Sequence, residues 1–129
     1  MILVDSSVWI DYFNGVETPE TDRLDALLGS ELLLTGDIVM AEVLQGFRHD
    51  SDFRRARLAL DQLVFRPMLG REIALASARH SRRPRARAVT VRKTIAMFIA
   101  TFCLENGHAL LHSDRDFDAI AEHLGLKMA

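Results

Sequence analysis

The stretch Ile2-Leu3-Val4-Asp5-Ser6-Ser7 decides the fold that we expect for this chain of 129 residues. Three consecutive apolar residues are typical of a short strand that is buried on both faces, as in a parallel sheet. A serine at position 6 or 7 then favours the start of a helix, because its hydroxyl can cap free backbone N–H groups. A buried strand followed at once by a helix to about Phe13 predicts the first part of an alternating α/β fold.

Short apolar runs alternate with helical patterns along the rest of the chain. Two more strands are expected, at residues 32–35 and 109–112. Six more helices are expected, over residues 20–28, 37–47, 53–64 (capped by Ser51-Asp52), 71–82, 90–106 and 116–124. This alternation predicts a short, mainly parallel sheet flanked by helices. Because we find no internal repeat and no linker, we expect residues 1–129 to form a single domain.

The composition limits the class of protein. A chain of this length with 49% hydrophobic residues can bury a core without disulfides or metal staples. No apolar run approaches the roughly 20 residues that a membrane-spanning helix needs, and the N-terminus has no basic leader of the kind found in signal peptides. The single cysteine, Cys103, excludes an intramolecular disulfide and a multi-cysteine zinc site. We therefore expect a protein of the reducing cytoplasm.

The net charge of −2 hides a strong asymmetry along the chain. Residues 1–52 carry eleven acidic and two basic side chains, whereas residues 53–103 carry twelve basic and two acidic ones. An acidic focus beside a basic surface suits a protein that holds cations and also binds a polyanion. The alternative is that oppositely charged helix faces simply pair with one another.

Acidic residues follow two of the expected strands directly. Asp5 follows the first strand, and Asp114 and Asp116 follow the strand at 109–112. Ligands of parallel α/β sheets collect beyond the carboxyl ends of the strands, and hard cations such as Mg²⁺ prefer oxygen ligands. These acids are therefore candidate metal ligands. The alternative is that Asp5 and Asp116 only cap the helices that follow them.

Glu42 is the fourth candidate. It lies within the helix expected at 37–47, and helical spacing places Val39, Val43 and Gly46 near it. An acid on such an apolar face is either a structural partner or an inward-facing ligand, and the two alternatives stand equal from the pattern alone.

In their order and spacing, these residues resemble the PIN-domain family, and within it the VapC toxins of bacterial toxin–antitoxin pairs. Asp5-Ser6-Ser7-Val8-Trp9-Ile10 resembles the first motif, Ala41-Glu42-Val43-Leu44-Gln45-Gly46 the second, and residues 110–118 the fourth. The resemblance extends over essentially the whole chain. It implies a PIN-like three-layer sandwich and a ribonuclease that uses Mg²⁺ or Mn²⁺ to hydrolyse tRNA or another structured RNA. It also implies inhibition by a VapB-type antitoxin and a homodimer.

The third motif departs from the family pattern. In the segment of residues 89–101, VapC proteins normally have an Asp where Ala96 stands in this chain. Alanine has no oxygen to offer, so one carboxylate of the expected site is absent. We expect the chain to be inactive or weakened as it stands, either because it carries an inactivating change or because it is a naturally degraded member.

The resemblance assigns a role to each candidate. Asp5, Glu42 and Asp114 are the expected metal ligands and catalytic residues, with Asp116 binding directly or through a water, and Ser7 orients Asp5 or a metal-bound water. Ser6 and Ser7 could equally be helix caps and nothing else. Metal-assisted hydrolysis needs no protein nucleophile, in agreement with the lack of a Ser-His-Asp or Cys-His pattern.

A basic stretch supplies the candidates for RNA contact. The chain has 14 Arg and only 2 Lys, and the planar guanidinium group suits phosphate. We expect four of these side chains to contact RNA phosphates, although some of them could only solubilise a helix face: Arg85, Arg87, Arg92 and Lys93. His112 and Cys103 are expected to have structural roles.

Two other interpretations compete with the ribonuclease. A non-catalytic PIN-like module that binds RNA or a partner protein is supported mainly by Ala96. A phospho-receiver domain also places acids at strand ends, but it needs paired acids after the first strand and a lysine at a late strand end, which this sequence lacks.

Overall fold

The structure, a computed structural model, describes residues 1–82 and 94–129. Helices and strands alternate along the chain as the sequence predicts. Their order is β1 (Ile2–Val4), α1 (Ser6–Phe13), α2 (Pro19–Leu28), β2 (Leu33–Thr35), α3 (Asp37–Leu44), α4 (Asp50–Asp61), β3 (Val64–Phe65), α5 (Arg71–Ser81), α6 (Thr94–Asn106), β4 (Ala109–Leu111) and α7 (Asp116–Leu124). The described residues thus form an α/β fold, as expected.

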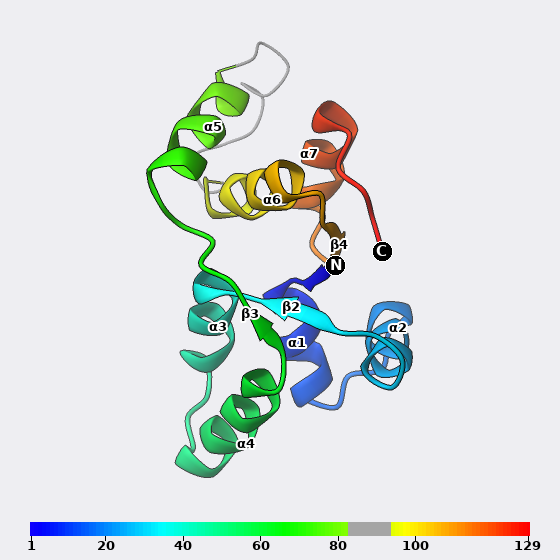
Figure 1. Cartoon of the computed structure of the whole chain (residues 1–129). Helices are drawn as coiled ribbons and strands as arrows, with labels where there is room; N and C mark the ends of the chain where they lie inside the picture. Colours follow the sequence, from blue (N-terminus) through cyan, green and yellow to red (C-terminus); the bar gives the residue numbers. More distant parts are fainter. Residues whose placement is uncertain (83–93) are drawn as a thin grey trace.

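The sheet has the strand order β3-β2-β1-β4, and every neighbouring pair is parallel. In the centre, Leu3 lies opposite Leu34 on one side and Leu110 on the other. Helices α1 to α4 cover one face, and α5 to α7 cover the other (Figure 1). This arrangement confirms the prediction of a three-layer sandwich with a mainly parallel sheet.

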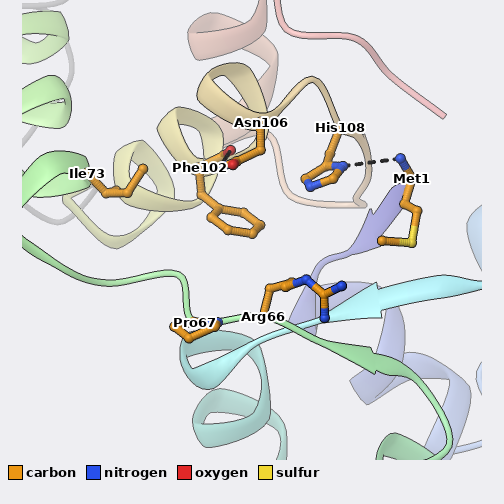
Figure 2. A pocket seen from close by; sticks show the side chains of 7 residues that line it. All are labelled: Met1, Arg66, Pro67, Ile73, Phe102, Asn106 and His108. Carbon is orange, nitrogen blue, oxygen red and sulfur yellow. Dashed lines mark hydrogen bonds between the residues drawn. The ribbon is translucent and has the colours of Figure 1, made fainter.

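The strand order creates a switch point at the centre of the sheet. From β1 the chain moves to β2 and β3 on one side, and it then crosses to β4 on the other side of β1. In α/β sheets, ligands bind beyond the carboxyl ends of the strands that flank such a point. At the opposite edge, the amine of Met1 donates to His108 Nδ1 at 3.1 Å (Figure 2).

The core consists of the inner strands and the helix faces that pack on them. Leu3, Leu34 and Leu110 are fully buried, and each contributes about 1.5–3 kcal/mol to folding by leaving water. Trp9 of α1 is 1% exposed and stacks on Phe13 at a ring distance of 5.6 Å. Within the described residues, none of the helices has the length and apolar character needed to span a bilayer.

Several predicted boundaries are wrong. The helix expected at 53–64 begins at Asp50 and ends at Asp61, and its N-cap is His49 rather than Ser51 or Asp52. Val64, which was expected to be the last residue of that helix, instead forms the edge strand β3 together with Phe65. The helix expected at 37–47 ends at Leu44, and α6 begins at Thr94 in the described part of the helix expected at 90–106.

Candidate active site

Asp5 directly follows the last residue of β1, and it is the N-cap of α1. Its side-chain oxygen Oδ2 accepts hydrogen bonds from Ser7 N at 3.0 Å and from Ser7 Oγ at 2.6 Å. The prediction that a serine caps this helix is therefore wrong, because Asp5 does so. Both hydrogen bonds from Ser7 go to Oδ2, and the residue is only 3% exposed.

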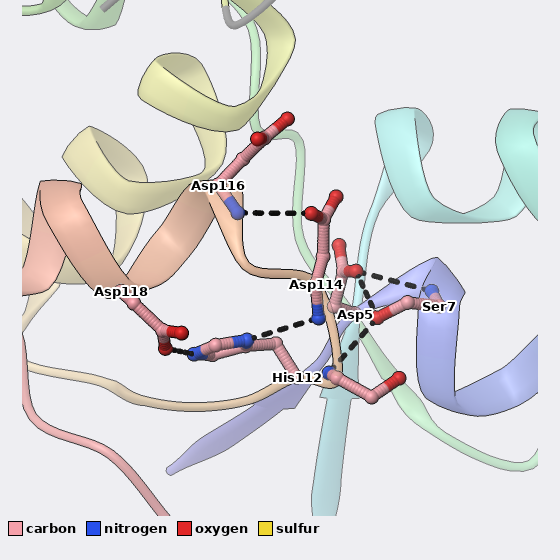
Figure 3. A network of polar contacts seen from close by, with 7 residues as sticks. Asp5, Ser7, His112, Asp114, Asp116 and Asp118 are labelled. Carbon is pink, nitrogen blue, oxygen red and sulfur yellow. Dashed lines mark hydrogen bonds and ion pairs between the residues drawn. The ribbon is translucent and has the colours of Figure 1, made fainter.

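Ser7 connects the ends of the two central strands. Its hydroxyl donates to Asp5 and also accepts from the backbone N–H of Ser113, just after β4, at 3.2 Å (Figure 3). The two contacts hold the β1–α1 and β4–α7 junctions together. The contact with Asp5 is the one that an orienting role of Ser7 requires, and that role stays a prediction.

Glu42 reaches the same region from α3. It is half-buried, and its Oε1 accepts a hydrogen bond from Ser6 Oγ at 3.1 Å. The two adjacent serines thus orient two different carboxylates, Ser7 acting on Asp5 and Ser6 on Glu42. From the sequence, Ser7 alone is expected to be an orienting residue, and Ser6 is left as a possible cap. The hydroxyl directly after the strand-end acid was the only sequence signal for its role.

The β4–α7 junction is organised around Asp114. Its Oδ1 accepts from the backbone N–H of Asp116 at 2.9 Å, and its own N–H donates to His112 Nδ1 at 3.2 Å. The His112 ring packs against Phe117 at 5.0 Å, and its Nε2 lies 3.7 Å from Asp118 Oδ1 (Figure 3). The N-cap of α7 is Arg115, so the alternative that Asp116 caps this helix is wrong. A structural role was expected for His112, and in the structure its ring accepts a hydrogen bond from the backbone of Asp114.

A cavity of about 100 Å³ brings these side chains together at the carboxyl edge of β1 and β4. Four carboxylates and position 96 share it although they are far apart in sequence. Ser6 of α1 and apolar side chains from α6 and α7 form the rest of the wall. The lining residues are Asp5, Ser6, Glu42, Ile95, Ala96, Ile99, Asp114, Asp116 and Phe117.

The carboxylates of this cavity, which we call the acidic cavity, disfavour one another's charge. Burial raises the pKa of Asp5, and the nearby Asp114 raises it further, while the hydrogen bonds from Ser7 oppose the shift. Burial also raises the pKa of Glu42, followed by the charges of Asp5 and Asp114. A cation placed among them would relieve this repulsion.

The residues present fit a divalent cation in their chemistry. All four acids offer carboxylate oxygens, the ligands that Mg²⁺ and Mn²⁺ prefer. Within residues 1–82 and 94–129, however, no three Asp, Glu, His or Cys side chains are spaced as the ligands of a bound ion are. Three of the four carboxylates accept hydrogen bonds instead, Asp5 from Ser7, Glu42 from Ser6 and Asp114 from the backbone N–H of Asp116.

Two other groups of candidates complete the set. The expected RNA contacts Arg85, Arg87, Arg92 and Lys93 are outside the described residues. Cys103 is buried in the core, and burial raises its pKa to about 12. A thiol of this kind is a packing residue, as we expected.

The family comparison decides the relationship of the chain. The PIN-domain family matches residues 2–123. This chain belongs to the PIN-domain family. Over its whole length it is 30% identical to a VapC ribonuclease of Mycobacterium bovis and to ribonuclease VapC11 of Mycobacterium tuberculosis, and the match covers 98% of each relative. The resemblance to VapC proteins seen in the motifs is therefore confirmed across the full chain.

Proposed function

We propose that this chain has the architecture of a VapC-type toxin, a metal-dependent endoribonuclease that hydrolyses phosphodiesters in tRNA or another structured RNA. The observation that carries the proposal is the acidic cavity, where β1, α3 and the β4–α7 junction contribute four carboxylates to one space. Its position at the switch point of the sheet is where α/β proteins bind ligands. Two VapC relatives are named as ribonucleases, and PIN-domain nucleases generally use a divalent metal.

In this proposal Asp5, Glu42 and Asp114 hold Mg²⁺ or Mn²⁺, and Asp116 binds it directly or through a water. Such an ion would activate a water and neutralise charge on the phosphoryl oxygens. The chain's own hydroxyls prepare the ligands, because Ser7 fixes Asp5 at 2.6 Å and Ser6 fixes Glu42 at 3.1 Å. Fixed carboxylates lose less freedom when they bind an ion, so these serines are positioning residues.

Position 96 limits the activity of the chain as it stands. Ala96 lines the acidic cavity from α6 and is half-buried, so a carboxylate at this position would project among the other four. With alanine there, a bound cation is less neutralised and less well placed. Small misplacements at a reacting centre can cost about a hundredfold in rate. We therefore propose that this chain is weakly active or inactive.

The test compares the chain with its Ala96→Asp and Ala96→Asn variants on a tRNA pool and on an unstructured RNA. Ala96→Asn is the matched control, because it adds nearly the same volume without the charge. Ala96→Asp is expected to cleave about a hundredfold faster than the other two in Mg²⁺ or Mn²⁺, and to stop in chelator. Equal cleavage by all three would show that position 96 is not part of the site.

A second candidate function is a non-catalytic module that binds RNA or a protein, which the alanine at position 96 favours. The same experiment separates the two functions. If Ala96→Asp folds, binds Mn²⁺ and still cleaves no RNA from its own host, the nuclease proposal fails. Retention of that RNA on filters by the unaltered chain would then support the binding module.

We also propose a VapB-like antitoxin as partner. Clustered carboxylates pair well with arginine, so an Arg-bearing segment of the antitoxin would fit the acidic cavity or its entrance. Co-expression with the product of the neighbouring gene should give a complex that survives moderate salt. Failure to co-purify in both low and moderate salt would count against the toxin assignment. The homodimer and the cytoplasmic location stay predictions, the first testable by light scattering.

A further inference from the structure

A second cavity, of about 470 Å³, lies between the sheet and the C-terminal half of α6 (Figure 2). It shares no lining residue with the acidic cavity. Asn106 in this cavity and Ala96 in the other are ten residues apart on α6, which corresponds to about 15 Å along the helix. The lining residues are Met1, Arg66, Pro67, Ile73, Phe102, Asn106 and His108.

The polar side of this cavity carries positive charge without a matching acid. Arg66 reaches toward Met1 and His108 from the end of β3 (Figure 2), and its Nη1 donates only to the neighbouring Phe65 carbonyl, at 2.8 Å. The Met1 amine faces His108 Nδ1 at 3.1 Å. None of the lining residues is acidic, and neither cation has a carboxylate partner among the described residues.

His108 adds a third donor. An ammonium group can only donate, so Nδ1 of His108 accepts from Met1, and the ring proton lies on Nε2. Burial lowers the pKa of His108, and the charges of the N-terminus and Arg66 lower it further. The surroundings of the ring therefore disfavour its protonated form.

The other side of the cavity is apolar. Pro67, Ile73 and Phe102 form this wall, and Phe102 lies with its ring 5.6 Å from that of His108. The volume lies within the range of about 300–1,000 Å³ that is usual for small-molecule sites. A ligand that fits both sides has an anionic end for the cations and an apolar or aromatic body for this wall.

We propose that this cavity binds a small organic phosphate, with the phosphate held by Arg66 and the Met1 amine and the body packed against Phe102. The guanidinium fork matches phosphate oxygens in geometry, and charge-assisted hydrogen bonds of this kind are about twice as strong as neutral ones. The site is separate from the acidic cavity and does not depend on the proposed nuclease function.

The test uses the full chain with its unmodified N-terminus and three probes: inorganic phosphate, adenosine 5′-monophosphate and adenosine. Calorimetry gives the affinities, and NMR follows the His108 ring. Adenosine 5′-monophosphate should bind most tightly, phosphate should compete with it, and adenosine should not bind. Because a bound phosphate offsets the positive charges, the pKa of His108 should rise when the monophosphate binds.

Arg66→Gln should weaken the monophosphate about tenfold or more, since the affinity gained from a charged hydrogen bond is lost. Arg23→Gln, on the exposed face of α2 in the other helix layer, is the matched control and should bind as the unaltered chain does. Three results would each overturn the proposal. The first is that Arg66→Gln binds the monophosphate as tightly as the unaltered chain does. The others are that adenosine binds as tightly as its monophosphate, or that the unaltered chain shows no saturable binding. Equal binding of phosphate and monophosphate would overturn the role of Phe102.

Discussion

Replacing Asp5 with Asn should make the protein more stable and the proposed enzyme less active. Asn caps helices about as well as Asp, and its carbonyl oxygen can accept from Ser7 as Oδ2 does now. The substitution therefore removes the charge while it keeps the shape. The new amide N–H₂ group would face Glu42 and Asp114, and it could donate to carboxylates that now repel the Asp5 charge.

The magnitude follows from the raised pKa of Asp5. Burial outweighs the hydrogen bonds from Ser7, so the folded chain favours the neutral form of this carboxyl group. Each unit by which the folded pKa exceeds the unfolded one corresponds to about 1.4 kcal/mol at a pH above both. The substitution removes this cost, so we expect Asp5→Asn to raise the free energy of unfolding at pH 7 in chelator.

The sign can be checked by varying pH. Below the ordinary value of 3.8 the carboxyl group is protonated in both folded and unfolded chains, so its charge costs the folded chain nothing. As the pH rises through the raised folded pKa, the unaltered chain loses stability, while the Asn variant has no charge to bury. The stability difference should therefore grow from about pH 4 upward and then level off.

Urea unfolding between pH 4 and 8 measures this difference, with the fluorescence of the single tryptophan, Trp9, as the signal. Asp25→Asn is the control, because Asp25 is exposed on α2 and the substitution should change little. Mn²⁺ should stabilise the unaltered chain more than Asp5→Asn, because an ion that binds only the folded state adds to its stability. If Asp5→Asn is less stable than the unaltered chain at pH 7 in chelator, the reasoning from burial and repulsion is wrong.

Three further predictions concern single residues. His112→Asn keeps an acceptor near the position of Nδ1 and should retain the affinity for Mn²⁺ in calorimetry, whereas His112→Gln should lower that affinity about tenfold. Equal losses of affinity in the two variants would rule out a role of His112 in positioning Asp114. With its pKa near 12, Cys103 should resist iodoacetamide at pH 8 in the folded chain and react fully in urea. Rapid labelling of the folded chain would contradict the burial of this thiol. Gly36→Ala should lower the free energy of unfolding by about 1–3 kcal/mol, because the new Cβ would overlap the buried Met68 side chain. Gly46→Ala is the control and should leave that free energy nearly unchanged, because the nearest atom to its new Cβ would be 3.7 Å away.

The four carboxylates of the acidic cavity could be predicted from local sequence. Asp5 and the pair Asp114 and Asp116 follow short, wholly apolar runs, and in a parallel sheet such runs end at the same edge. Glu42 was identifiable because an acid among apolar neighbours has to meet a partner. Asp5 caps α1 and also lines the acidic cavity, so its capping role does not exclude the ligand role, which stays a prediction.

The supporting parts could not be predicted in the same way. The two residues of β3 are too few to show a period, and their only signature is pairing with β2, which is distant in sequence. The hydrogen bond between Ser7 and Ser113 joins residues 106 positions apart, so no local pattern contains it. The hydrogen bond from Asp114 to His112 depends on the backbone path of the β4–α7 junction, which the residue types alone do not specify.

The pairing of β1 with β4 also sets the order in which activity can arise during folding. The first strand of the chain becomes central only when a strand more than a hundred residues later docks beside it, and such distant contacts carry the largest cost in loop closure. A partly folded chain in which only β1, β2 and β3 are paired holds Asp5 and Glu42 but has not yet received Asp114 and Asp116. Such a chain would lack two of the four carboxylates, so the proposed capacity to cleave RNA, once position 96 allows it, would require β4 to be docked beside β1.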